Sequence, residues 1–252
     1  MTDDAGLAAG RRLGQRSWPR IAVEIIAVVA SILMAFGIDA WWDVNQARLD
    51  EEVALGALRS EFLQNRSSLV ERIELNRMGM ARVRDFLRAS PDELRSTGPD
   101  ILVDFANDLW APLTFDPALG ATSGYLTQGV VVTEQGELVR RAVTDWERSF
   151  LDAGEEAAAL WGASHAALAA LATHVAQVSP NEGETAGILS LVRVEPVETL
   201  LAAQRDDQLR GLSITKVTLQ NIYTRELSDL LVLTDSVLAV LGVEIETLPP
   251  RP

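Results

Sequence analysis

The sequence predicts an all-α protein in which an N-terminal transmembrane helix is followed by an elongated bundle of three long helices and several short ones. Residues 21 to 38 read IAVEIIAVVASILMAFGI, a run long and apolar enough to cross a bilayer. Beyond it, three long stretches place apolar residues three and four positions apart, the spacing of an amphipathic helix. Short segments rich in proline and glycine separate these stretches and are typical of turns.

The charge of the chain is distributed unevenly. Its 252 residues carry a formal net charge of -14. Residues 1 to 20 hold four arginines against two aspartates, a charge of +2, which leaves -16 for the rest. A body this acidic repels phosphate backbones, so we expect no nucleic-acid partner. Cysteine is absent, which excludes disulfides and thiolate metal sites. Lys216 is the single lysine among 22 basic residues, which we attribute to genomic base composition.

The membrane segment is predicted to cover residues 18–42. Trp18 precedes the apolar run, and Trp41 and Trp42 follow it. At about 1.5 Å per residue, the rise from Trp18 to Trp41 is about 34 Å, so these tryptophans are expected at the two membrane interfaces. The basic tail, residues 1–17, is predicted to be cytoplasmic because acidic residues crowd the other end of the segment. This places the chain in the inner membrane with its body in the periplasm.

A cleaved secretory signal is the alternative for this segment, because such signals also pair a basic start with an apolar run. The run is longer than the usual apolar region of a signal. It also leads into a helical pattern without a good cleavage site, since Ile38 occupies a position that needs a small residue. We therefore favour the anchor.

One face of the anchor gathers its polar and small residues: Glu24, Ala27, Ser31, Ala35 and Asp39. Small residues four positions apart allow two membrane helices to approach closely, so this face is predicted to contact another membrane helix, from a second copy or a partner. In the alternative interpretation, Glu24 pairs with Arg20 and reaches the cytoplasmic headgroups.

The body is expected to form one helical unit over residues 43–246, followed by a proline-rich tail at 247–252. A long helix is predicted from 43 to about 89, a second after Thr133, and a third after Gly211. Shorter helices are expected after the capping-box sequence that begins at Ser90, near 101–110, within 112–129, and from about 197 to 210. The second long helix carries the most regular seam: Val139, Val143, Trp146, Phe150, Ala153, Ala157, Leu160, Ser164, Leu168, Leu171, Val175 and Val178.

The anchor sequence, from Glu24 through Ser31 to Asp39 and Trp41, resembles the N-terminal signature of a family of uncharacterised bacterial single-pass membrane proteins, described as a domain of unknown function. Ser31 and Asp39 stand where that family usually has glycine and asparagine. The resemblance continues at residues further along the chain, namely Leu58, Glu61, Asn65, Phe115, Pro117, Leu126, Gly129, Glu137, Leu138 and Arg140. It implies an anchored helical bundle and supplies no catalytic residues.

The residues that could carry chemistry are few. His165 and His174 are nine positions apart on one predicted helix and therefore lie on opposite faces, so they cannot share a metal ion. Ser164 precedes His165, but it lies mid-helix on the apolar seam, where packing explains it better than nucleophilic catalysis. We therefore predict no enzyme activity and no cofactor.

Phe115 and Tyr125 lie in a long glycine- and proline-containing loop and are the remaining candidates. They are expected to close the end of the bundle, with a ligand or partner site as the alternative. The sequence thus favours a membrane-anchored interaction or scaffold protein, either self-associating or part of an envelope assembly. The alternative is a sensor that binds a ligand outside the membrane and signals through a membrane partner.

Overall fold

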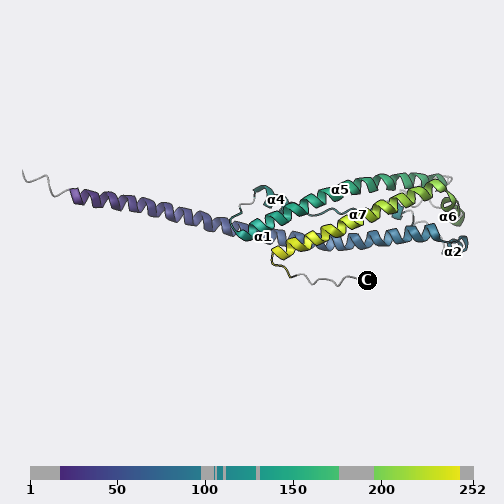
Figure 1. Cartoon of the computed structure of the whole chain (residues 1–252), viewed down its shortest axis with the longest axis horizontal. Coiled ribbons are helices and arrows are strands. Elements are labelled where there is room, and N and C mark those ends of the chain that lie inside the picture. The colour runs from purple at the N-terminus through teal and green to yellow at the C-terminus, as the bar shows by residue number, and fades with distance from the viewer. Residues whose placement is uncertain are drawn as a thin grey trace, which may run out of the picture.

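The computed structural model describes residues 18–97, 105, 107–109, 112–128, 131–175 and 196–244. Every regular element among them is a helix, and Figure 1 shows one very long helix extending from an elongated bundle. The predicted fold, an apolar N-terminal helix followed by a helical bundle, is therefore confirmed.

Helix α1 (Trp18–Arg88) joins the predicted anchor and the first long helix of the body into one element of 71 residues. At about 1.5 Å per residue its length is about 107 Å. Neither proline nor a pair of glycines interrupts the chain between Trp41 and Leu55, so the ladder of backbone hydrogen bonds continues through the junction. The anchor and the bundle therefore share one helix axis.

Two further long helices complete the bundle, α5 (Glu134–Val175) and α7 (Asp207–Val240). Helix α7 packs along both α5 and α1. The predicted seam of α5 faces this core, with Val139, Val143, Trp146 and Leu160 fully buried. Phe150 is only partly buried and stacks on Trp146, with ring centroids 5.7 Å apart.

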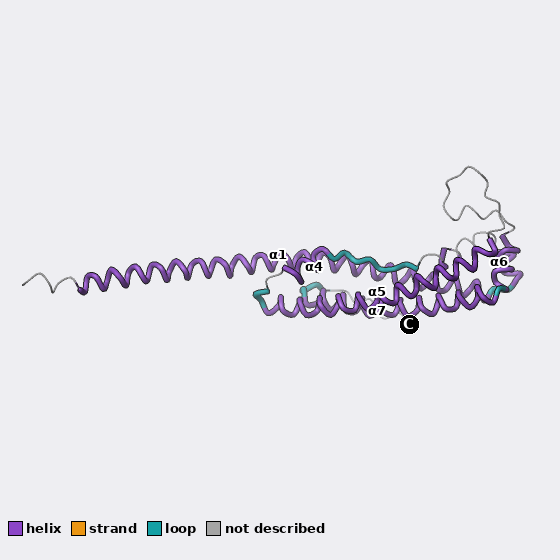
Figure 2. Tube along the Cα trace, turned by 90° about the horizontal axis from the view of Figure 1, so that it is seen from above, coloured by secondary structure: helices purple, strands orange, loops and turns teal. Residues whose placement is uncertain are grey.

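The remaining side of the bundle is occupied by an extended segment, residues 112–119, and the short helix α4 (Gly120–Gln128). We call residues 112–128 the strap. Helix α4 contacts both α1 and α5, and Figure 2 shows the extended part of the strap running beside α1. This agrees with the prediction of turns around one short helix in this region.

At the far end of the bundle, α2 (Pro91–Thr97) begins with the predicted capping box. The Glu93 amide donates to Ser90 Oγ at 3.3 Å, and the Ser90 amide donates to Glu93 Oε2 at 2.7 Å. A second core lies here, and the predicted helix near 101–110 contributes to it through Phe105 and Leu109. The described part of that segment is helical at 105 and 107–109.

The boundary predicted at Gly211 is wrong. Helix α6 (Pro196–Arg205) ends earlier, and α7 begins at Asp207 because the Asp206 carboxylate accepts from the amides of Gln208 and Leu209. A side-chain cap of this kind satisfies the free amides of a first turn, and an exposed glycine inside a long helix costs only about 1 kcal/mol.

Helix α7 ends at Val240, before the predicted end of the helical unit at residue 246. Gly242 adopts a φ of 76°, a conformation that glycine enters without steric penalty, and the Val243 amide donates to the Leu238 carbonyl at 2.9 Å. The predicted tails, 1–17 and 247–252, and Val178, the last residue of the predicted seam, lie outside the described residues.

Candidate functional site

The predicted interaction face lies on the part of α1 that extends beyond the bundle. Glu24, Ala27, Ser31, Ala35 and Asp39 are all exposed, and α1 contains an 18-residue apolar window without a buried residue. The Ser31 hydroxyl donates to the Ala27 carbonyl at 2.8 Å, so its hydrogen bond is made within the helix. By length and composition this segment could cross a membrane.

The predicted interface tryptophans lie on the same helix. Trp18 is its first residue, and Trp41 and Trp42 expose 64% and 62% of their surface. Isoleucine, valine, leucine and phenylalanine side chains between Ile21 and Ile38 are exposed to a similar extent. Contiguous apolar surface of this size is unusual on a protein surrounded by water and is expected where lipid or another helix covers it.

Four side chains of α1, just beyond the anchor, hold the ends of the other elements of the bundle. We call Glu51, Arg59, Glu61 and Asn65 the collar. Its carboxylates lie at helix N-termini and its guanidinium lies at a helix C-terminus. Both arrangements oppose the helix dipole and are therefore stabilising.

Glu61 caps helix α4 from outside that helix. Its Oε2 accepts from the Ala121 amide at 2.7 Å, and its Oε1 accepts from the Thr122 amide at 2.9 Å and the Thr122 hydroxyl at 2.7 Å. The residue is 9% exposed. A nearly buried carboxylate is thus satisfied by three donors, as such a group requires.

Asn65 fixes the strap one helical turn further along. Its Nδ2 donates to the Ala118 carbonyl at 2.9 Å, and its Oδ1 accepts from the Ala118 amide at 2.9 Å. This two-way pairing uses both ends of the amide side chain. Together, Glu61 and Asn65 bind backbone groups of Ala118, Ala121 and Thr122, on both sides of the point where the extended strap enters α4.

Glu51 is almost fully buried against the first turn of α5. Its Oε1 accepts from the Thr133 hydroxyl at 3.0 Å, and that hydroxyl also accepts from the Gly136 amide at 3.0 Å. A Cβ at Gly136 would lie 1.7 Å from Glu51 Oε1, so only glycine leaves room for the carboxylate. Glu51 Oε2 has no hydrogen-bond partner among the described residues.

Arg59 completes the collar at the end of α7. Its Nη2 donates to the Leu241 carbonyl at 2.5 Å, where the helix leaves carbonyls without partners. An ion pair, Arg66 with Asp235 at 2.7 Å, joins the same two helices about two turns further on. Helix α1 thus fixes the positions of α4, α5 and α7 relative to the anchor.

Phe115 and Tyr125, the two loop candidates, point into the bundle and are 7% and 2% exposed. The Phe115 ring packs edge-on against Phe150 at 6.2 Å, and the Phe115 amide donates to Tyr223 Oη at 2.8 Å. Tyr125 Oη donates to the Gly136 carbonyl at 2.8 Å. Burial, followed by the charge of Glu51, raises the pKa of Tyr125. Contacts within the bundle therefore hold both aromatic side chains, while their role in closing its end, or in binding a ligand or partner, stays a prediction.

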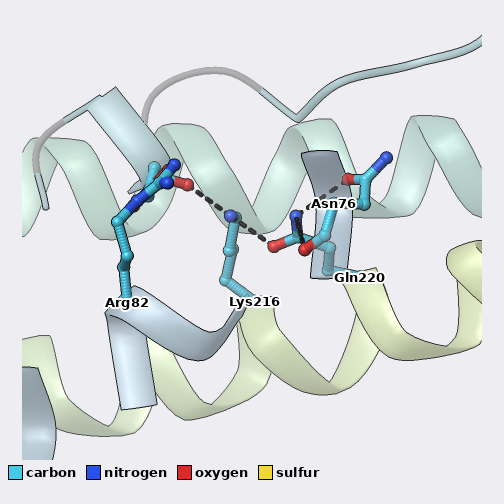
Figure 3. A network of polar contacts seen from close by, with 5 residues as sticks. Asn76, Arg82, Lys216 and Gln220 are labelled. Atoms are coloured by element: carbon cyan, nitrogen blue, oxygen red, sulfur yellow. Dashed lines mark hydrogen bonds and ion pairs between the residues drawn. The ribbon is translucent and has the colours of Figure 1, made fainter. Parts of the chain in front are cut away.

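A chain of polar side chains crosses the core nearer the far end (Figure 3). Gln220 Nε2 donates to Asn76 Oδ1 at 2.8 Å, and Lys216 Nζ donates to Gln220 Oε1 at 2.5 Å and to the Asp108 carbonyl. The Asp108 carboxylate pairs with Arg82 at 2.6 Å. Lys216 is fully buried, and this burial lowers its pKa to about 8.

The other candidates for chemistry are separated. His165 is exposed beside Trp161, whereas His174 Nε2 lies 2.7 Å from Asp206 Oδ2. The amide of Leu209, together with His174, lowers the pKa of Asp206. Ser164 is fully buried. Across the described residues, no group of three or more histidines and acids could hold a metal ion.

Sequence reasoning missed the collar as a set. Its signal was a polar residue inside an apolar seam: Asn65 occupies a core position of α1, and a buried amide side chain needs partners. The structure brings Glu61 and Asn65 into contact with the strap at Ala118 and Ala121, while the family resemblance stays a prediction. No family model, curated protein or solved structure matches the chain.

Proposed function

We propose that this protein is a membrane-anchored interaction protein, with a cytoplasmic N-terminus in the inner membrane and a periplasmic helical bundle that it holds for a partner. The observation that carries the proposal is α1, which contains both the apolar segment and one wall of the bundle core. A flexible linker would serve a simple tether equally well. A continuous helix instead fixes the orientation of the bundle relative to the membrane.

The collar supports the same proposal. Since α1 binds the ends of α4, α5 and α7, forces on the bundle pass directly to the anchor. The anchor face, from Glu24 to Asp39, has no partner among the described residues and would meet another membrane helix in this role. Pairing of Glu24 with Arg20 at the headgroups is the competing account of that face.

The alternative function, a ligand-binding sensor, is supported by the contacts between the strap and α1. Because Asn65 and Glu61 bind the strap, a ligand that displaced it would act on the helix that enters the membrane. Phe115 and Tyr125 are buried in internal contacts, which favours a structural role for the strap and places the interaction role first.

Reporter fusions would test the orientation. A reporter fused at residue 5 should report a cytoplasmic location, because the arginines of the N-terminal tail stay in the cytoplasm. A reporter fused after Pro252 should report a location outside the cytoplasm. Both reporters on one side would contradict the proposal. A mature N-terminus near Trp41 would show a cleaved signal instead of an anchor.

Partner binding would be tested by changing the anchor face in native membranes. Ser31→Leu should weaken association without preventing insertion, because the larger side chain keeps the helices apart. Cross-linking at Ala27 reports the association. Products that are equally abundant with and without Ser31→Leu, or no products at all, would refute a role for this face.

A further inference from the structure

One face of α1 remains uncharged well beyond the anchor. At about 100° per residue, a set of residues from Ala27 to Ser67 falls within an arc of about 80° around the helix axis and so forms one face. We call these residues the outer strip: Ala27, Ser31, Ala35, Ile38, Trp42, Asn45, Leu49, Val53, Gly56, Ser60, Leu63 and Ser67. None of them carries a charge, and the strip ends where Glu71 and Glu74 enter the same face.

The outer strip faces away from the protein's own core. All its residues are exposed, whereas Leu58, Phe62 and Leu69 point to the opposite side of α1 and are fully buried. Its apolar members outside the anchor include Val53, which is 75% exposed, and Leu63, which is 45% exposed. The strip is therefore a continuous helix face that no other part of the described bundle covers.

We infer that a second copy of this chain covers the outer strip, with the two α1 helices parallel and in register from the anchor through Ser67. This inference rests on the proposed function, since it names the partner of the anchor face and extends the contact outside the membrane. The pair would be about 60 Å long at about 1.5 Å per residue.

The course of the strip identifies this partner. From Trp42 to Ser67 it continues for about 38 Å past the anchor, so a partner that covers all of it must be a straight helix that also crosses the membrane. Helix α1 meets both requirements. Two copies inserted with the same orientation are necessarily parallel, and a two-fold axis brings each strip residue near its own counterpart. Gly56 and Ser60 then allow the close approach that Ala27 and Ser31 allow within the membrane.

The charges beside the strip also complement each other. One flank carries Asp39, Asp43 and Asp50, while the opposite flank carries Arg48 and Arg59 together with Glu52. In a parallel two-fold pair, each flank of one helix faces the opposite flank of the other. The acidic flank of one copy thus meets Arg48 of its partner on both sides of the contact, while Arg59 is bound to the Leu241 carbonyl of its own chain.

The natural absence of cysteine makes disulfide cross-linking a direct test. Ser60→Cys is compared with Ser236→Cys in the full-length protein in native membranes. Both serines are exposed, and the contacts of Arg59 with Leu241 and of Arg66 with Asp235 place them at a similar height along the bundle. Mild oxidation should give about tenfold more covalent dimer for Ser60→Cys, since only that residue is held near its counterpart.

Two differently tagged copies in one cell identify the dimer by the presence of both tags. Leu63→Glu in the Ser60→Cys background should abolish the dimer because like charges would face each other, while Leu151→Glu, an exposed leucine on α5, should not. Equal cross-linking at Ser60 and Ser236, or none at Ser60, would overturn the inference. Cross-linking at Ala27 without cross-linking at Ser60 would overturn it too, yet leave the proposed anchor contact standing.

Discussion

The Glu51 carboxylate lies where a side chain on Gly136 would begin, with Oε1 only 1.7 Å from the position of a Cβ on that glycine. One residue belongs to the helix that carries the anchor, and the other belongs to the first turn of α5. Their contact explains why a glycine, ordinarily unfavourable inside a helix, occupies this turn. The contact also joins the anchor helix to α5 in two ways, because the Glu51 carboxylate fills the space left by Gly136 and places a negative charge at the N-terminus of α5.

Gly136→Ala is therefore expected to destabilise the protein by about 2 to 4 kcal/mol, because Glu51 or the α5 backbone must move. Gly154→Ala is the matched control. Gly154 lies mid-helix in α5 with nothing within 4 Å of its Cβ position, so the substitution should stabilise by up to about 1 kcal/mol. Thermal unfolding followed by circular dichroism in detergent checks both. Glu51→Ala should relieve much of the Gly136→Ala defect, and strictly additive effects would show that the two residues do not meet.

Glu61→Gln should loosen the strap. The amide keeps one acceptor oxygen, whereas Glu61 now accepts from two amides and one hydroxyl, so we expect a loss of about 1 to 3 kcal/mol. Glu71→Gln, an exposed change on the same helix, should alter stability by less than about 0.5 kcal/mol. Hydrogen exchange of the Ala121 and Thr122 amides offers a local measurement. Unchanged protection of both amides would contradict the capping role.

Lys216 gives the stability a defined pH dependence. Burial lowers its pKa from 10.5 to about 8, so between these values the unfolded chain binds more protons than the folded one. Stability should therefore rise with pH across this window. The slope is measured from about pH 7.5 to about 9.5, below the titration of Tyr125 and Tyr223, whose pKa values burial raises. Lys216→Met should remove the slope, and a variant with the parent slope would show that Lys216 is not its source.

Ser164→Ala should leave the protein equally stable or stabilise it by about 1 kcal/mol, because the Ser164 hydroxyl is buried and makes no hydrogen bond in the described part of the chain. Thr234→Val provides the contrast. The Thr234 hydroxyl accepts from Trp146 Nε1 at 2.8 Å and donates to the Leu230 carbonyl, so its loss should cost about 1 to 2 kcal/mol. Denaturant unfolding distinguishes the two, and a strongly destabilised Ser164→Ala would reveal a partner for that hydroxyl.

The periodicity of the sequence was sufficient to predict the long helices and the direction of their buried faces. The seam from Val139 to Leu160 lies in the core as predicted, and the capping box at Ser90 forms as its spacing indicates. Both are local signals, set by neighbours within four residues. The error at Gly211 has the same origin, since a glycine is a strong local signal for a helix boundary, while the aspartate cap that begins α7 lies five residues before it.

The collar depends on contacts that local patterns do not encode. Glu61 and Thr122 are 61 positions apart, and Arg59 and Leu241 are 182 positions apart. Periodicity marks Asn65 as a polar residue in a core position but does not identify Ala118 as its partner. The same holds for Lys216, whose burial follows from a tertiary network rather than from its own segment.

In the proposed anchoring, the unbroken α1 would be a rigid rod held at one end in the bilayer. From Trp42 to Arg88 it extends for about 69 Å at about 1.5 Å per residue, so a change of about 10° in the tilt of the anchor would sweep the far end of the bundle sideways by about 12 Å. Turning the anchor about its own axis would present a different wall of the bundle to the same neighbour. Bilayer thickness, through the tilt that it imposes, would thus set the lateral position of the distal core over the membrane.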